Sequence, residues 1–514
     1  MSGQMRPEPG AHAADGRRRG ALALLGLLAM LPLAAVRAAG AAADPTGTAA
    51  PAAPAATHAT APAQEPRDAR ALGGGRFGIV HVYIPAGPAH SVAIFVSGDG
   101  GWELGVINMA RALRSMGALV IGVNVQEYFA SLRRAAQRAD AHCQMIAADF
   151  ESLSHQVQKQ LGLREYHVPV LVGYSSGATV VYATLVQSPP GTFAGALSLG
   201  FCADQDFAGA ALCPGNGLRY TQNAQHALVF EPAANLKQPW LALQGQQDQV
   251  CDAQAAEEFT AQVAGGALVK LPLVGHGFSV ERNWMPQFRA AYAQLAARPP
   301  VSAGATPEIS DLPLQEVHAT AAAPEFALLL TGDGGWAGLD QELAARLAAK
   351  GVPTVALNSL KYFWSERTPD QTAGDVTRVL RHYLAAWHAQ RVLLIGYSFG
   401  ADVLPFVVNR LPPEVRAQVA SVSLLGLDAH ASFEIHLADW VGDTDAGPAT
   451  RPELEALKEM PILCIYGEGE ADSICPQLTA GHITREQVGK GHHFSGEYAL
   501  LADRILGYTR TSTR

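Results

Sequence analysis

The chain carries the stretch VLLIGYSFGA at residues 392–401. Residues 392–395 form a continuous apolar run, which is typical of a strand buried on both faces of a sheet. The next five residues fit the pattern G-x-S-x-G, and the residues after them are compatible with a helix. A strand, a sharp turn that holds a serine, and a helix together make a nucleophile elbow. The stretch therefore predicts an α/β-hydrolase fold with Ser398 at the carboxyl edge of a mostly parallel sheet.

The same stretch occurs a second time, as VLVGYSSGA at residues 170–178, which gives Ser175 the place of Ser398. Other blocks repeat in the same order. IFVSGDGGW (94–102) matches LLLTGDGGW (328–336), DQVC (248–251) matches DSIC (472–475), and GHGFS (275–279) matches GHHFS (491–495). A period above about 200 residues indicates a duplicated domain and not a solenoid. We predict two tandem α/β-hydrolase-like domains, each a mostly parallel sheet with helices on both faces.

Composition indicates the domain boundaries. Residues 1–40 combine three consecutive arginines at 17–19, an apolar run and an alanine-rich end, which is the pattern of a secretory signal peptide; an uncleaved membrane anchor is the alternative. Residues 41–75 are rich in Ala, Pro and Thr and indicate a flexible linker, with ordered structure from about Arg76. We expect the N-terminal domain at 76–297, a second linker at 298–313, and the C-terminal domain at 314–514. The exported chain would lie in the periplasm.

Overall composition excludes several classes of protein. Of 514 residues, 48% are hydrophobic and 16% charged, which supports large cores and excludes a mostly disordered chain. The 37 basic and 46 acidic residues give a net charge of −9, so bulk charge offers no attraction for nucleic acid. Only one apolar run approaches the length of a membrane span, which excludes a polytopic membrane protein.

Six cysteines in an exported chain favour disulfides. Within the second half, Cys464 with Cys475 is the simplest pair. The four cysteines of the first half, at 143, 202, 213 and 251, allow three pairings that the sequence leaves open. Their spacing does not indicate a zinc site, and no motif indicates a metal or an organic cofactor.

A serine hydroxyl needs a base to become a good nucleophile, and α/β-hydrolases arrange their triad in the order Ser, acid, His. In the second half, we predict Ser398 as nucleophile, Asp472 as the orienting acid and His492 as the general base. Asp472 is preferred because it aligns with Asp248 of the first half, and His492 because it aligns with His276. Residues 468 and 470, both glutamates, are alternative acids, and His493 is the alternative base.

The glycine-rich loop at 332–336 follows a strand and occupies the place of an oxyanion loop. We expect the amides of Asp333 and Gly334, with that of Phe399, to face the tetrahedral oxyanion. Trp336 is a candidate for substrate contact, with core packing as the alternative.

The first half carries an equivalent set, with Ser175, Asp248 and His276. Two interpretations stay open: it is a second active site, or a decayed copy that keeps the elbow for structural reasons.

Four blocks resemble the AcvB/VirJ family of exported bacterial virulence proteins: TGDGGW (331–336), GYSFGAD (396–402), FEIHL (433–437) and GHHF (491–494). This resemblance implies a periplasmic hydrolase that cleaves the aminoacyl ester of lysyl- or alanyl-phosphatidylglycerol. It places the nucleophile at Ser398 and the base in the pair His492/His493. The substrate would be a membrane phospholipid reached by transient contact with the membrane surface; the sequence does not indicate protein partners.

A lysyl head group carries two positive charges, so acidic residues near the elbow are candidates to bind it. We single out Asp428, which ends an apolar strand, and Glu434, within the FEIHL block. Two other functions remain open from the sequence: a general exported esterase or lipase, and a non-catalytic secretion-accessory binding protein built on two hydrolase-like domains.

Overall fold

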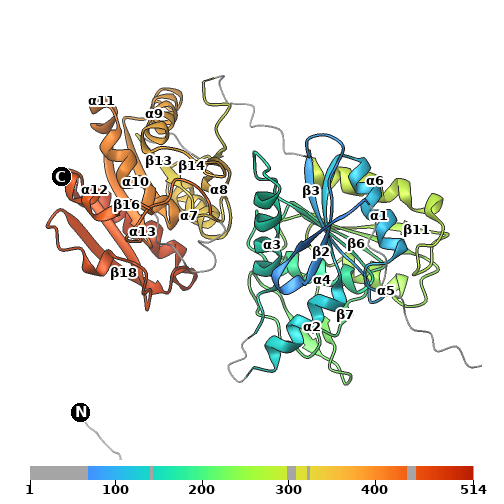
Figure 1. The fold of residues 1–514 in the computed structure, drawn as a ribbon. Helices are drawn as coiled ribbons and strands as arrows, with labels where there is room; N and C mark the ends of the chain where they lie inside the picture. The colour runs from blue at the N-terminus through green and yellow to red at the C-terminus, as the bar shows by residue number, and fades with distance from the viewer. Residues whose placement is uncertain (1–67, 139–142, 298–307, 321–323, 437–446, 513–514) are drawn as a thin grey trace, which may run out of the picture. The chain divides into compact units, whose positions relative to one another are not determined.

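The computed structural model describes residues 68–138, 143–297, 308–320, 324–436 and 447–512 (Figure 1). The predicted signal peptide, most of the first linker and residues 298–307 of the second linker lie outside these ranges. The first strand begins at Arg70, earlier than the expected start near Arg76. Residues before 314 also belong to the C-terminal domain, because Ile309 is buried in its core.

The N-terminal half forms an eight-stranded sheet with the strand order β1-β2-β4-β3-β5-β6-β10-β11. The pairs β1–β2 and β2–β4 are antiparallel, and every other neighbouring pair is parallel. The strands are β1 (Arg70–Gly73), β2 (Ile79–Tyr83), β3 (Ser91–Val96), β4 (Ala118–Val123), β5 (Val170–Tyr174), β6 (Gly195–Leu199), β10 (Trp240–Gly245) and β11 (Gly266–Leu271). A small antiparallel sheet adds β7 (Asp204–Gln205), β8 (Tyr220–Gln222) and β9 (Leu228–Phe230).

The C-terminal half forms a seven-stranded sheet with the order β12-β14-β13-β15-β16-β17-β18. Only the edge pair β12–β14 is antiparallel. The strands are β12 (Leu314–Val317), β13 (Glu325–Leu330), β14 (Thr354–Leu357), β15 (Arg391–Tyr397), β16 (Val419–Leu425), β17 (Ile462–Glu468) and β18 (Ile483–Lys490). The two sheets share their central strand order, as a duplicated domain requires.

Helices connect the parallel strands. In the N-terminal half they are α1 (Leu104–Ser115), α2 (Val125–Ala136), α3 (Ile146–Gln160), α4 (Ser176–Gln187), α5 (Ala253–Thr260) and α6 (Met285–Ala296). In the C-terminal half they are α7 (Gly338–Ala349), α8 (Ser359–Tyr362), α9 (Pro369–Ala386), α10 (Phe399–Arg410), α11 (Pro413–Arg416), α12 (Thr450–Ala456) and α13 (Tyr498–Ser512).

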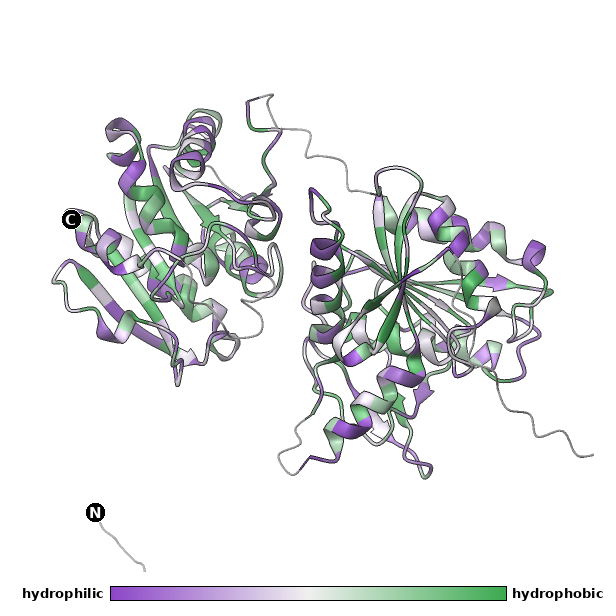
Figure 2. Ribbon diagram, viewed as in Figure 1, coloured by the Kyte–Doolittle hydropathy of each residue, from purple (hydrophilic) through white to green (hydrophobic). Residues whose placement is uncertain are grey.

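Each sheet is covered on both faces, because alternate residues of its strands enter different cores. On β13, Leu328 packs into the core formed with α9 and α10, while Leu329 packs into the one formed with α7 and α13. The central strands are accordingly buried and among the most hydrophobic parts of the chain (Figure 2). Two tandem α/β-hydrolase-like domains, each with helices on both faces of a mostly parallel sheet, are therefore confirmed.

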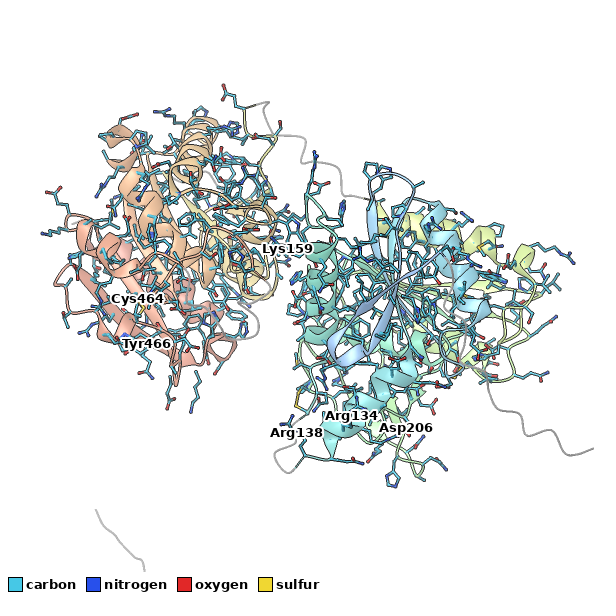
Figure 3. All side chains as sticks on the ribbon, viewed as in Figure 1. Arg134, Arg138, Lys159, Asp206, Cys464 and Tyr466 are labelled. Carbon is cyan, nitrogen blue, oxygen red and sulfur yellow. A yellow bond between two sulfur atoms is a disulfide. The ribbon has the colours of Figure 1, made fainter. Side chains whose placement is uncertain are left out.

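All six cysteines form disulfides. The predicted pair Cys464–Cys475 is confirmed (Figure 3). In the first half the structure selects Cys143–Cys213 and Cys202–Cys251 from the three open pairings. Of the helices in the described ranges, none has the length and apolar character that crossing a bilayer requires.

Candidate active site

Both predicted nucleophiles lie on strained turns between a strand and a helix. Ser398 connects β15 to α10 with φ 51° and ψ −123°, and Ser175 connects β5 to α4 with φ 55° and ψ −123°. A non-glycine residue in such a conformation costs on the order of 1–3 kcal/mol, so the surrounding structure must enforce it. The glycines of the motif permit the turn: a Cβ on Gly400 would collide with the carbonyl oxygen of Leu330.

The N-terminal half contains a complete hydrogen-bonded triad. Ser175 Oγ lies 2.8 Å from His276 Nε2, and His276 Nδ1 lies 2.9 Å from Asp248 Oδ2. The Asp248 side chain is fully buried and also accepts the backbone N–H groups of Val250 and Cys251, at 2.9 and 2.8 Å. The carboxylate thus fixes the imidazole with Nε2 facing the serine, which is the geometry of a general base.

In the C-terminal half, the acid next to the histidine is Glu470. Its Oε1 lies 2.5 Å from His492 Nδ1, and its Oε2 accepts the backbone N–H of Gly467 at 2.7 Å. The Glu470 side chain is only 4% exposed, whereas Asp472 lies on an exposed part of the loop. The structure therefore corrects the preferred acid from Asp472 to the alternative that the sequence left open.

Counting from the glycine at the carboxyl end of each strand would have found Glu470. Asp248 comes three positions after Gly245, which ends β10, and Glu470 comes three positions after the corresponding Gly467 of β17. Six positions separate Gly245 from Cys251, but eight separate Gly467 from Cys475. The C-terminal loop is therefore longer by two residues, and aligning the two Asp-x-x-Cys blocks moved the predicted acid from Glu470 to Asp472.

The paired histidines of the C-terminal half have different contacts. His492 faces Glu470, while His493 Nδ1 lies 3.0 Å from the hydroxyl of Tyr397. Only His492 thus has the carboxylate partner of a general base. Among the described residues, Ser398 Oγ makes no hydrogen bond to His492, whereas Ser175 Oγ is hydrogen-bonded to His276 in the N-terminal half. Such bonds are often long in unliganded enzymes and tighten in the substrate complex.

The tyrosine before each nucleophile is a site residue that the sequence reasoning missed. Tyr174 donates its hydroxyl proton to the backbone carbonyl of His276 at 2.9 Å, and Tyr397 does the same to His492 at 3.4 Å. Each tyrosine therefore ties the histidine loop to the elbow. The repeated Gly-Tyr-Ser of both copies was the available signal.

The charge around His492 favours its protonated form. Burial by itself would lower the pKa of His492, but the hydrogen bond and charge of Glu470 oppose it, and Asp333 and Asp472 add to that effect. The net result is a pKa above the ordinary value of 6.5.

The predicted oxyanion loop lies against the C-terminal elbow. A Cβ added to Gly332 would lie 3.6 Å from the Cβ of Ser398, and Thr331 Oγ1 anchors the loop by accepting the N–H of Ser359 at 2.8 Å. Phe399 occupies the first position of α10, where backbone amides have no partner within the helix. The Gly334 amide, however, donates to the Asp333 side chain at 3.0 Å, so in this arrangement it is not a free oxyanion donor.

The three predicted substrate-binding residues differ in their surroundings. Trp336 is partly buried and packs against the core cluster that contains Leu339 and Leu343, which accords with the packing alternative. Glu434 Oε1 lies 3.0 Å from the ammonium nitrogen of Lys159, so its charge is already paired. Asp428 lies at the carboxyl end of β16, the edge at which Ser398 stands.

Asp428 is accompanied by a carboxyl group that the sequence reasoning did not select. Asp402 Oδ1 accepts the backbone N–H of Asp428 at 2.7 Å. Burial raises the pKa of Asp402 well above its ordinary value, and the charges of Asp428, Asp333 and Glu470 raise it further, against the hydrogen bond from the Asp428 amide. Four carboxyl groups thus interact beside the elbow, and their mutual repulsion would be relieved by a cation.

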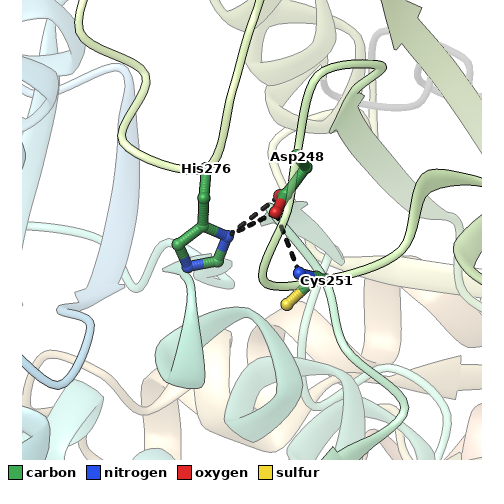
Figure 4. Close-up of side chains that lie close together, drawn as sticks. All are labelled: Asp248, Cys251 and His276. Carbon is green, nitrogen blue, oxygen red and sulfur yellow. Dashed lines mark hydrogen bonds and ion pairs between the residues drawn. The ribbon is translucent and has the colours of Figure 1, made fainter.

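Asp248, Cys251 and His276 also gather closely enough to raise the question of a metal site (Figure 4). The chemistry of the donors does not fit one. Cys251 is bonded to Cys202 and therefore has no thiolate to offer, and His276 Nδ1 is already paired with Asp248. The group is better explained as the acid and base of the triad, with the Cys251 amide holding the acid in place.

Several solved structures are similar to part of the chain. An esterase domain from Rhodothermus marinus is 15% identical and covers 42% of this chain and 92% of its own, with a TM-score of 0.29. An α/β serine hydrolase homologue from Coxiella burnetii is 16% identical over 45% and 98% of the two chains, with a TM-score of 0.30. A serine hydrolase without a lid from Xanthomonas campestris is 21% identical over 46% and 98%, with a TM-score of 0.29.

No curated protein gives a significant match to the chain. A family model does match: that of the bacterial virulence protein VirJ, over residues 90–197 and 324–513. The first segment contains the N-terminal elbow and the second contains the whole C-terminal site. Because the two segments together cover more than half of the sequence, the chain belongs to the VirJ family of bacterial virulence proteins.

Proposed function

We propose that the protein is a periplasmic serine ester hydrolase that removes the amino acid from lysyl- or alanyl-phosphatidylglycerol at its C-terminal site. The observation that carries the proposal is the hydrogen bond between the buried Glu470 and the partly exposed His492, beside the strained Ser398 elbow. A carboxylate, an imidazole and a serine in this order are the parts that acyl transfer needs.

In the proposed reaction, Ser398 Oγ attacks the aminoacyl carbonyl carbon while His492 takes the hydroxyl proton. Glu470 stabilises the imidazolium that forms, and the Phe399 amide donates to the oxyanion. The ester bond breaks, and His492 returns the proton to the leaving phosphatidylglycerol oxygen. Water, deprotonated by His492, then attacks the acyl-enzyme and releases the amino acid.

The carboxyl groups beside the elbow support an aminoacyl substrate. An aminoacyl ester carries an α-ammonium group close to its reacting carbonyl, and a lysyl ester carries a second ammonium. Asp428 and the buried Asp402 lie together at the strand edge next to Ser398, and a bound ammonium group would favour the charged form of Asp402, whose pKa burial raises. A general fatty-acyl esterase gains nothing from such a group.

The compartment is part of the proposal. Three disulfides accord with an oxidising environment outside the cytoplasm. We propose that the protein meets its phospholipid substrate by transient contact with the membrane surface.

The test incubates the mature chain with vesicles that contain lysyl-phosphatidylglycerol and follows free lysine and phosphatidylglycerol. We expect Ser398→Ala to abolish lysine release, and Ser152→Ala, at an exposed serine of α3, to retain it. If Ser398→Ala releases lysine at the wild-type rate, the site assignment is wrong. If wild type cleaves fatty-acyl esters but not the aminoacyl ester, the substrate is wrong.

A further inference from the structure

The N-terminal triad is too complete to be explained by fold maintenance alone. Ser175, His276 and Asp248 form both hydrogen bonds of a working triad, at 2.8 and 2.9 Å. The elbow also keeps the strained backbone of Ser175, at φ 55°. Strain of this kind persists where function uses it, and a decayed copy could relax it by replacing the serine with glycine.

The N-terminal site has the same frame as the C-terminal site but lacks its extra carboxyl groups. Four positions after the nucleophile, Asp402 is replaced by Thr179. Asp428 comes three positions after the end of β16. Three positions after the end of the equivalent strand β6, the N-terminal domain has Cys202, which is bonded to Cys251. In both domains a side chain of the first position bonds to the backbone of the second. Thr179 Oγ1 donates to the Cys202 carbonyl at 2.7 Å, whereas Asp402 accepts from the Asp428 amide.

The loops around the N-terminal triad carry exposed apolar side chains. Val250 follows Asp248 on the acid loop and is 68% exposed. Leu273 and Val280 flank His276 on its loop and are 66% and 44% exposed. Large apolar side chains left in water on the loops that carry the acid and the base indicate a surface for an apolar ligand.

From these three observations we propose that the N-terminal domain is a second, independent esterase whose substrate is an uncharged ester with an apolar acyl chain. Ser175 Oγ attacks the acyl carbonyl carbon as His276 Nε2 takes its proton, and the alcohol leaves with that proton. Water then attacks the acyl-enzyme, gives one proton to His276, and releases the carboxylic acid while Ser175 regains its hydroxyl. The proposal does not rest on the function proposed for the C-terminal site.

The first test removes the C-terminal nucleophile. In a full-length Ser398→Ala background, we expect hydrolysis of p-nitrophenyl hexanoate, and a further Ser175→Ala substitution should reduce kcat/KM on the order of 10³-fold. Ser152→Ala in the same background is the matched control. In the wild-type chain, a fluorophosphonate should label the peptide that contains Ser175, as mapped by mass spectrometry. Thermal melting of each variant verifies its fold.

The second test addresses the acyl group. Leu273→Ser should lower the hexanoate-to-acetate ratio of kcat/KM about threefold to tenfold, because it removes apolar contact with the longer chain. The control Leu500→Ser, at a leucine of α13 that is 37% exposed, should leave the ratio unchanged.

An unlabelled Ser175 together with hexanoate hydrolysis that survives Ser175→Ala would overturn the second site. A ratio that Leu273→Ser does not alter would overturn the apolar acyl specificity. Loss of lysine release in Ser398→Ala bears only on the C-terminal site, so failures of the two proposals are distinguishable.

Discussion

His492 Nδ1 lies 2.5 Å from Glu470 Oε1, and Glu470 comes three positions after Gly467 of β17, as Asp248 comes three positions after Gly245 of β10 in the other domain. The two domains thus hold their histidines with carboxylates of different length. Glu470 and Asp248 stand at equivalent positions of their loops, and the glutamate side chain is longer by one methylene group.

This relationship predicts unequal effects of two neighbouring substitutions. Glu470→Gln should reduce kcat/KM for aminoacyl ester hydrolysis at least on the order of 10²-fold, because an amide neither holds the imidazole in the right tautomer nor stabilises the imidazolium. Asp472→Asn, at an exposed position, should change it less than about threefold. Steady-state kinetics in a Ser175→Ala background measures both. The reverse order of the two effects would restore Asp472 as the acid.

The raised pKa of His492 predicts the pH dependence of the C-terminal reaction. A general base must be unprotonated, so kcat/KM should fall as the pH decreases through the pKa of His492, with a midpoint above 6.5. A water-soluble lysine ester and the Ser175→Ala background isolate this site. A midpoint below 6.5 would contradict the electrostatic role of Glu470.

The same shift affects stability with a definite sign. Because the folded state binds this proton more tightly than the unfolded chain, the stabilisation is fully present below pH 6.5 and is lost as the pH rises through the raised pKa. Glu470→Gln should therefore flatten the fall in the free energy of unfolding of the C-terminal domain over that interval.

The close approach of α10 to β13 predicts the effect of a methyl group at Gly400. Gly400→Ala should lower the free energy of unfolding by about 1–3 kcal/mol, because its Cβ meets the backbone of Leu330. Gly374→Ala, in the exposed middle of α9 with open space around it, should instead stabilise by about 0.5–1 kcal/mol. Denaturant unfolding distinguishes the two. Equal changes in the free energy of unfolding would mean that α10 shifts to accommodate the added methyl group without cost.

The disulfide Cys202–Cys251 predicts a link between redox state and the N-terminal triad. Its removal should cost about 2–4 kcal/mol, given the 49-residue separation of the two cysteines. It should also slow labelling of Ser175, because the Cys251 amide donates to Asp248. The control removes Cys464–Cys475 in the other domain and should leave that labelling unchanged. Equal labelling in both variants would show that this disulfide does not position Asp248.

The motif-bearing elements were predictable because their signals are local. The apolar run before Ser398, the glycines around it and the helix after it depend on residues within a few positions of one another. The acid was harder to predict, because Glu470 and Asp472 lie in one loop and two sequence rules disagree: the count from the strand glycine favours Glu470, and the Asp-x-x-Cys match favours Asp472. The choice depends on how β17 and β18 place two loops beside each other.

By itself, the sequence determined the duplication, the order of nucleophile, acid and base, both elbows, and the Cys464–Cys475 pair, which needs only residues close along the chain. Only the tertiary structure decided the other two disulfides, the role of Glu470, and the closed triad of Ser175, His276 and Asp248. The physical reason is the same for each. Local patterns fix strands and helices, whereas the meeting of side chains from separate loops depends on the packing of the whole sheet.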